Sequence, residues 1–236
     1  MNIYLDIETI PSQHPNVRNE LAKEINQPGN ISKPETIAKW HEETKPGLIQ
    51  DAWLKTSFDG ALGQIVVASV AIDDAEPMTF FAEDWANSER HILASLFDAI
   101  RAATERELNG GIVGRLKPVF VGHYIVDFDL RFIFQRAAIL GIKPADCIPF
   151  NARPWGDDVF DTMVAWSGIK GRVSLDKLCR VFGVAAKGTE IGEEIDGSKV
   201  WEFVRDGRIS DVAKYCAGDV ERVRSIHKRL TFSNVS

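Results

Sequence analysis

The chain opens with a run that alternates as a β-strand does. Residues 2–9 place apolar side chains on one face and an aromatic ring with two acids on the other. The first face carries Ile3, Leu5 and Ile7, and the second carries Tyr4, Asp6 and Glu8. The pattern predicts a core strand whose second face holds two carboxylates.

Further apolar runs predict more strands. A Val- and Ile-rich run predicts a strand at 62–72, and residues 76–82 form its expected partner after a turn at Asp73 and Asp74. The run 117–123 predicts a buried strand, and 157–166 contains a further short one.

Segments with the apolar periodicity of helices lie between and after these strands. An apolar stripe predicts a helix from Glu89 to Leu108, and residues 128–141 predict a second one that Gly141 closes. Residues 174–183 predict a helix with Ser174 as its cap and Gly183 at its end. The last long helix runs near residues 209–230, and residues 14–57 predict a Pro-punctuated helical insertion.

Strands mixed with helices indicate an α/β fold with a mixed central sheet flanked by helices. We find no internal repeat, low-complexity tract or linker, so we expect residues 1–236 to form one domain. Apolar residues make up 44% of the chain, which is ordinary for a protein with a real core.

The composition of the chain indicates the cellular compartment in which we expect it. No apolar run approaches the roughly 18 residues of a membrane span, and the N-terminus has neither the charged nor the apolar region of a signal peptide. The three isolated cysteines form no C-x-x-C pair, which argues against a zinc knuckle or a disulfide framework; they are Cys147, Cys179 and Cys216. We therefore expect a reducing, cytoplasmic setting.

The net charge of −6 argues against broad electrostatic attraction to nucleic acid. It does not exclude a nuclease, because bound cations can invert the field locally. Charge is also unevenly spread, because residues 170–187 hold five basic side chains against one acid, Asp176.

Asp6 and Glu8 stand two apart in the first strand, so their carboxylates point the same way. Two like charges this close raise one pKa unless a cation sits between them. Oxygen ligands suit hard ions such as Mg²⁺ or Mn²⁺. Incidental acids on a solvated strand face are the alternative.

Two other stretches carry acids in suggestive places. In VGHYIVDFDLRFIF, residues 121–134, Asp129 opens the predicted helix just after Phe128, and Asp127 is a rival candidate. In DVAKYCAGDVERV, residues 211–223, Tyr215 and Asp219 share one helical face beside an apolar stripe. Each has a plain structural reading: a helix dipole favours acids at its start, and Asp219 could pair with a nearby arginine.

Taken in this order, D-x-E, F-D and Y-x-x-x-D resemble the DEDD superfamily of 3′–5′ exonucleases. The closer resemblance is to the exonuclease domain of family B DNA polymerases and to stand-alone bacterial proteins related to it. GNISKPETIAKW, GHYIVDFDL and EIDGSKVWEFVRDGRISDVAKYCAGDV carry that resemblance over nearly the whole chain. A tyrosine four residues before Asp219, with Lys214 where another branch has histidine, resembles the DEDDy type.

The resemblance implies a ribonuclease-H-like fold and two divalent cations, Mg²⁺ or Mn²⁺. It implies that Asp6, Glu8 and Asp219 hold one ion, and that Asp6 bridges to a second ion held by Asp129. Tyr215 would orient the attacking water, since a pKa near 10 makes tyrosine a poor base at neutral pH. The expected reaction shortens DNA from its 3′ end, with single strands preferred, and releases nucleoside 5′-monophosphates.

One residue departs from the family pattern, which usually has asparagine where Tyr124 stands. This affects how the terminal nucleotide is held and leaves the metal ligands unchanged. Lys170, Arg172 and Lys187 are our candidates for gripping the nucleic-acid backbone, against a reading as a solvated basic surface. We expect Asp161 to be structural. An exoribonuclease with the same metal chemistry, or a non-catalytic nucleic-acid-binding module of this fold, are the alternatives; oligomeric state is open.

Overall fold

The computed structural model describes residues 1–108, 112–193 and 195–233. Its main sheet has five strands in the order β3-β2-β1-β6-β7. The strands are β1 (Asn2–Ile10), β2 (Gln64–Ile72), β3 (Met78–Phe80), β6 (Val119–Gly122) and β7 (Val159–Asp161). β1 pairs antiparallel with β2 and parallel with β6, so the sheet is mixed and β1 is its central strand.

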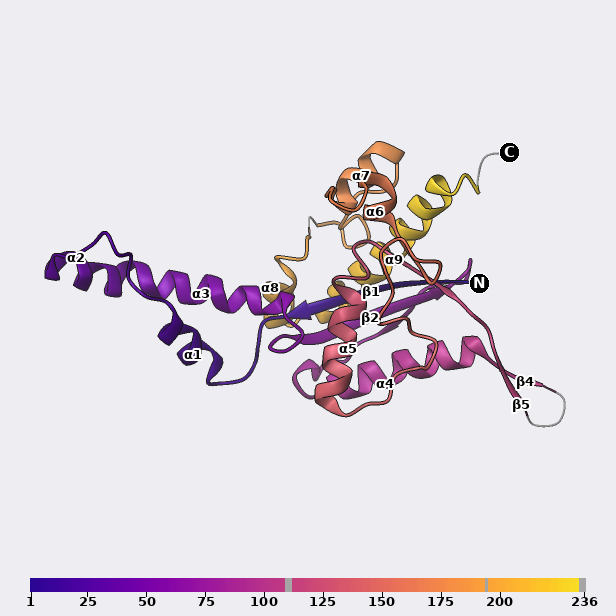
Figure 1. Ribbon diagram of the computed structural model, residues 1–236, viewed down its shortest axis with the longest axis horizontal. Coiled ribbons are helices and arrows are strands. Elements are labelled where there is room, and N and C mark those ends of the chain that lie inside the picture. Colours follow the sequence, from indigo (N-terminus) through magenta and orange to yellow (C-terminus); the bar gives the residue numbers. More distant parts are fainter. Residues whose placement is uncertain (109–111, 194, 234–236) are drawn as a thin grey trace.

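Helices cover both faces of this sheet (Figure 1). The α-helices are α1 (Val17–Glu24), α2 (Pro34–Lys39), α3 (Lys45–Lys55), α4 (Trp85–Thr104), α5 (Asp129–Leu140), α6 (Thr162–Ser167), α7 (Leu175–Phe182), α8 (Val200–Arg205) and α9 (Ile209–Leu230). A π-helical turn, η1 (Trp40–Thr44), and a 3₁₀ turn, η2 (Thr56–Phe58), flank α3. Among the described residues, no helix is both long enough and apolar enough to cross a membrane.

The segment from α1 to α3 forms an arm that projects from the end of the sheet opposite the N-terminus (Figure 1). Its base is fixed by Trp53, whose indole Nε1 donates a hydrogen bond to the Ser12 carbonyl over 2.8 Å. The same ring meets Trp201 of α8 edge-on at 5.5 Å, and the guanidinium of Arg18 lies 3.9 Å from its centroid. The arm therefore joins the core where β1 ends.

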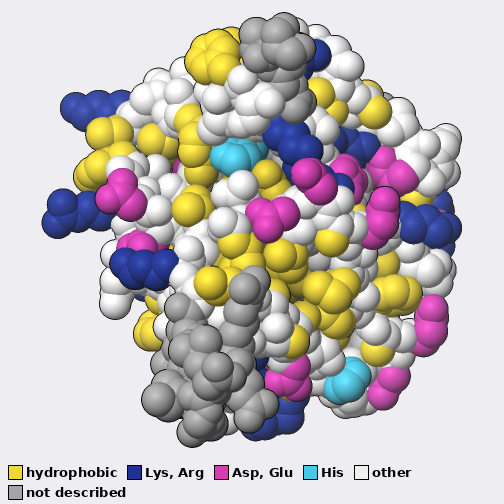
Figure 2. Space-filling model, turned by 90° about the vertical axis from the view of Figure 1, so that its right-hand side faces the viewer, with side chains coloured by type: hydrophobic (Ala, Val, Ile, Leu, Met, Phe, Trp, Pro, Cys, Tyr) yellow, Lys and Arg dark blue, Asp and Glu magenta, His cyan; other side chains and the backbone are white. Residues whose placement is uncertain are grey.

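A second sheet is a hairpin of two strands, β4 (Glu105–Leu108) and β5 (Ile112–Arg115). Figure 2 shows the face of the molecule that carries this hairpin and the N-terminus. Lys and Arg side chains lie beside Asp and Glu side chains there, with hydrophobic side chains between them. The described part of this face therefore has no patch of a single charge that would suit nucleic acid.

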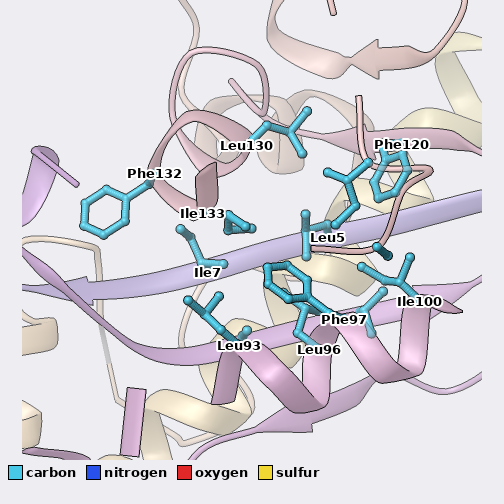
Figure 3. Close-up of a cluster of buried hydrophobic side chains, with 14 of the residues drawn as sticks. Leu5, Ile7, Leu93, Leu96, Phe97, Ile100, Phe120, Leu130, Phe132 and Ile133 are labelled. Atoms are coloured by element: carbon cyan, nitrogen blue, oxygen red, sulfur yellow. The ribbon is translucent and has the colours of Figure 1, made fainter. Parts of the chain in front are cut away.

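The core follows from the alternation in β1. Leu5 and Ile7 lie against α4 and α5 on one face of the sheet, together with Ile3. Figure 3 shows Leu93, Leu96 and Phe97 of α4 beside these two β1 side chains, with Leu130 and Ile133 of α5 above. The other face packs against α7, α8 and α9. Burial of one face fixes the strand's register, so the opposite face holds Asp6 and Glu8 in defined places.

The predicted strands are all present, and so are the helices closed by Gly141 and Gly183, both of which have positive φ. The prediction of a helix from Glu89 to Leu108 is wrong at both ends. The helix begins at Trp85 and ends at Thr104, and Glu105–Leu108 forms strand β4. The buried stripe continues to Thr104, which is 2% exposed, and the chain then pairs as a strand with β5.

Candidate active site

Asp6 and Glu8 lie on the central strand, where hydrogen bonding to β2 holds the backbone on one side. Glu8 is buried and Asp6 is half-buried. The register of β1 against β2 shifts between Glu8 and Thr9, so a β-bulge follows directly after the second acid. Bulges redirect side chains near sites, and the pairing with β2 resumes beyond this one at Thr9 and Ile10.

Asp129 is brought to the same place by the N-terminus of α5. Its Oδ1 accepts a hydrogen bond from the backbone N–H of Ile7 over 3.2 Å. Ile7 is the residue between Asp6 and Glu8, so this bond ties Asp129 to the part of β1 that carries both acids. Asp129 is 3% exposed, whereas Asp127 is exposed. Of the two rival acids, the structure brings Asp129 to the carboxylates of β1.

The long helix α9 supplies the third part of the site. Tyr215 and Asp219 are both buried on it, one helical turn apart. The ammonium Nζ of Lys187 reaches both, at 2.7 Å from the Tyr215 hydroxyl and 2.5 Å from Asp219 Oδ2. Lys214 instead pairs with Asp211 over 3.2 Å on the exposed side of the helix.

The three predicted basic residues occupy different environments. Lys170 and Arg172 are exposed, and the guanidinium of Arg172 lies 5.3 Å from the centroid of the Tyr124 ring. Lys187 has only 20% of its side chain exposed and belongs to the carboxylate cluster. Sequence reasoning grouped Lys187 with its basic neighbours, because nothing in the local pattern shows that its ammonium reaches α9.

Burial and the nearby carboxylates shift the pKa values of the groups in the site. Burial, followed by the charge of Asp219, raises the pKa of Asp6 to about 7. Burial and the neighbouring charge of Asp6 also raise the pKa of Glu8 and that of Asp129 well above their usual values. Burial opposes the charge on Lys187, but the carboxylates of Asp219 and Asp6 outweigh it and raise the lysine's pKa. The cluster therefore favours bound cations or protons.

Cys216 is a member of the site that sequence reasoning missed. Its Sγ lies 3.3 Å from Asp6 Oδ2 and 3.4 Å from the Asp6 carbonyl oxygen, which a thiol can reach as a weak donor. Possible donor atoms of Asp6, Glu8 and Cys216 all lie within 4.8 Å of one another. Burial raises the pKa of Cys216, so it stays a thiol and the oxygen atoms remain the better ligands for a hard cation.

Asp161 caps α6, as its carboxylate accepts hydrogen bonds from the N–H groups of Met163 and Val164. The same Oδ1 accepts from the backbone N–H of Tyr124 over 3.0 Å. These bonds fix the loop between β6 and α5, which supports the structural role expected for Asp161.

The departure at Tyr124 has a backbone consequence. Its φ is 63°, in the left-handed region, which asparagine adopts more readily than tyrosine does. Asparagine, the residue that the resemblance led us to expect at this place, would therefore suit the turn itself. In this chain the bonded Asp161 carboxylate and the stacked Arg172 hold the tyrosine in that conformation.

Comparison with known proteins gives the family. A sequence model of the family described as "Predicted 3'-5' exonuclease related to the exonuclease domain of PolB" matches residues 62–230. The chain belongs to this family. The matched residues run from the approach to β2 to the end of α9, and include Asp129, Tyr215 and Asp219.

A solved structure is similar over a wider range. It is described as "Structure of the family B DNA polymerase from the hyperthermophilic archaeon Pyrobaculum calidifontis", with a TM-score of 0.56 and 17% sequence identity. The match covers 98% of this chain and 24% of the polymerase, so the chain spans about a quarter of that protein's length. The expected fold is confirmed: the mixed sheet flanked by helices is that of the ribonuclease-H-like exonuclease domain. No curated protein matches this chain.

Proposed function

We propose that this chain is a metal-dependent 3′–5′ exonuclease that hydrolyses DNA, preferably single strands and 3′ ends, to nucleoside 5′-monophosphates. One observation carries the proposal. The chain belongs to a family described as predicted exonucleases, and its acids from β1, α5 and α9 lie together in one buried cluster. We further propose that residues 1–236 act as one exonuclease domain.

The donor set fits two hard divalent cations, Mg²⁺ or Mn²⁺, because it consists of carboxylates, whose oxygen atoms such ions prefer. Burial and mutual charge raise the pKa values of Asp6, Glu8 and Asp129, so a bound cation would be favoured beside them. The residues that would hold the two ions are Asp6, Glu8, Asp129 and Asp219. When bound, such ions supply a hydroxide nucleophile and stabilise the charge on the leaving 3′-oxygen.

Tyr215 orients the attacking water in this proposal, which makes the enzyme a DEDDy type. Burial and the charge of Glu8 raise the pKa of Tyr215, so its hydroxyl keeps its proton at neutral pH. A hydroxyl that keeps its proton can position water but cannot act as a general base.

Lys187 contacts the substrate phosphate in this proposal, and its ammonium beside Tyr215 and Asp219 supports that role. Lys170 and Arg172 would bind the nucleic-acid backbone farther from the carboxylates, since both are exposed and Arg172 lies over Tyr124. Local basic groups can attract phosphates although the chain as a whole is acidic.

The test is a time course on 5′-labelled single-stranded DNA, duplex DNA and RNA, with Mn²⁺, with Mg²⁺ and with EDTA. We expect a descending ladder on single-stranded DNA that EDTA abolishes, and slower cutting of blunt duplex, since unpairing an end costs a few kcal/mol. Asp6→Ala is the control and should lose at least about a thousandfold in rate.

Each other result has a defined meaning. Faster trimming of RNA would assign an exoribonuclease. Binding of oligonucleotides with no degradation in any metal would assign a binding module. Cutting of closed circular single strands would indicate an endonuclease and contradict the proposal.

A further inference from the structure

Arg222 is a buried cation that the proposed mechanism does not use. It lies on α9 three residues after Asp219, and only 4% of its side chain is exposed. A buried arginine is costly unless every donor finds a partner. The partners of its donor groups therefore indicate the role of Arg222.

The guanidinium joins two parts of the molecule. On α9 its Nη1 lies 3.1 Å from Oδ1 of Asp219. On the other side, its Nε donates to the Ala185 carbonyl over 3.1 Å and its Nη2 donates to the Ala186 carbonyl over 2.6 Å. Nη2 also pairs with Glu190 Oε2 at 2.5 Å.

These partners belong to one irregular segment, residues 184–193, which we name the strap. It has no α-helix or strand of its own and lies between α7 and α8. Lys187 stands in the strap directly after the two carbonyls that Arg222 holds. Gly218 allows the close approach, because a Cβ there would lie 2.8 Å from Glu190 Oε1 and 2.7 Å from Arg222 Nη1.

The same guanidinium thus fixes both neighbours of the Tyr215 hydroxyl. It occupies Oδ1 of Asp219, which leaves Oδ2 to face Lys187. It also anchors the backbone on which Lys187 is carried. We propose that Arg222 is a positioning residue that clamps the strap to α9 and so sets Asp219 and Lys187 for the exonuclease reaction; this rests on the proposed function.

Arg224 provides a matched control. It lies on the same helix, pairs with Glu221 three residues earlier, and donates to two backbone carbonyls, those of Asp73 and Ala75. Arg222 has the same kind of contacts, but they lead to the strap and the site. Arg222→Met and Arg224→Met therefore remove comparable sets of bonds, of which only the first concerns catalysis.

The first measurement needs no nuclease activity. A lysine-specific endoproteinase should cut after Lys187 faster in Arg222→Met than in the parent, because release of the strap frees that backbone. We expect at least about a tenfold increase in the fragment that ends at Lys187, measured by mass spectrometry on metal-free protein. Arg224→Met should keep the parent's rate at that bond.

The second measurement is steady-state hydrolysis of a single-stranded oligonucleotide in saturating Mn²⁺. Arg222→Met should lower kcat about ten- to a hundredfold and change KM less than threefold, because Asp219 and Lys187 act on the reacting phosphate. Arg222→Lys should recover part of kcat by keeping a cation beside Asp219. Glu190→Gln, which loosens only the strap, is the second variant if Arg222→Met does not fold.

The outcomes separate the two proposals. Equal behaviour of Arg222→Met and Arg224→Met, or no faster cleavage at Lys187 in either Arg222→Met or Glu190→Gln, would overturn the clamp. If the parent itself degrades no nucleic acid while cleavage at Lys187 still rises in Arg222→Met, the clamp stands and the proposed exonuclease fails.

Discussion

Asp127 and Asp129 stand two residues apart at the start of α5, and the fold treats them differently. Asp129 is buried against the backbone of Ile7, while Asp127 is exposed. A carboxylate among other buried carboxylates is the one that a cation would bind. The pair therefore offers a test in which the same substitution is made at neighbouring places.

We predict that Asp129→Asn lowers the rate of DNA hydrolysis by about a hundredfold or more, since it removes one charge from the proposed ligand set. Asp127→Asn should stay within about twofold of the parent. Hydrolysis of labelled single strands at saturating Mn²⁺ measures both. The opposite ranking would show that the wrong acid has been assigned.

Tyr215 can be tested without disturbing its packing. Tyr215→Phe keeps the buried ring and removes the hydroxyl that lies 2.7 Å from Lys187 Nζ. If the hydroxyl orients water, the maximal rate should fall about ten- to a thousandfold, the range for one positioned polar group. A Mn²⁺ titration of activity should give an unchanged midpoint with a lower plateau. An unchanged plateau would leave Tyr215 as a packing residue only.

At the scale of elements, the arm of α1 to α3 depends on few core contacts. In α3 only Trp53 is buried, and α2 buries no residue. Trp53 joins α3 to the end of β1 through Ser12 and to α8 through Trp201. Trp53 is thus a main anchor of the arm, beside the hydrogen bonds that Ser12 and Thr9 donate to η2.

We predict that Trp53→Ala lowers the free energy of unfolding by about 3–5 kcal/mol, because it removes a buried aromatic ring and leaves a cavity. Leu48→Ala in the same helix is the control: Leu48 is 41% exposed, so its loss should stay within about 0.5 kcal/mol. Urea unfolding followed by fluorescence measures both variants. Similar losses in the two variants would show that Trp53 does not anchor the arm.

At the scale of the whole molecule, α4 and α5 close one face of the sheet and α7 to α9 close the other. His123 ties the loop after β6 to the approach to α7. Its Nε2 donates to the Val173 carbonyl over 2.9 Å, and its Nδ1 lies 2.9 Å from Thr162 Oγ1. Burial, with a smaller effect of the charge of Lys187, lowers the pKa of His123 to about 4.

We predict that this histidine makes the fold sensitive to acid. The pKa is lower in the folded chain than the usual 6.5, so protonation favours the unfolded chain. The stabilisation is complete above about pH 6.5 and is lost as pH falls towards 4, by up to about 3 kcal/mol. Urea unfolding at pH 7, 6 and 5 should show a steeper loss in the parent than in His123→Gln. Parallel curves would contradict the prediction.

Much of the fold was determined by local pattern. The alternation of Ile3, Leu5 and Ile7 fixed β1 and the face on which Asp6 and Glu8 lie, since a strand has a period of two. The stripe of α9 and the four-residue spacing of Tyr215 and Asp219 likewise set one helical face. Glycines at the ends of α5 and α7 stopped those helices at the expected residues. Such features repeat within a few residues, so the sequence alone could predict them.

Only the tertiary structure decided what lies beside the carboxylates. Lys187 reads as one of several basic residues, yet its ammonium meets Tyr215 and Asp219 because the strap crosses α9. Cys216 reaches Asp6, and Arg222 reaches the strap, through contacts that no spacing reveals in advance. Helix α4 ends at Thr104, where the chain continues as strand β4 and pairs with β5. Periodicity determines which face a side chain takes; the partner on that face comes from a distant part of the chain, and only the folded chain brings the two together.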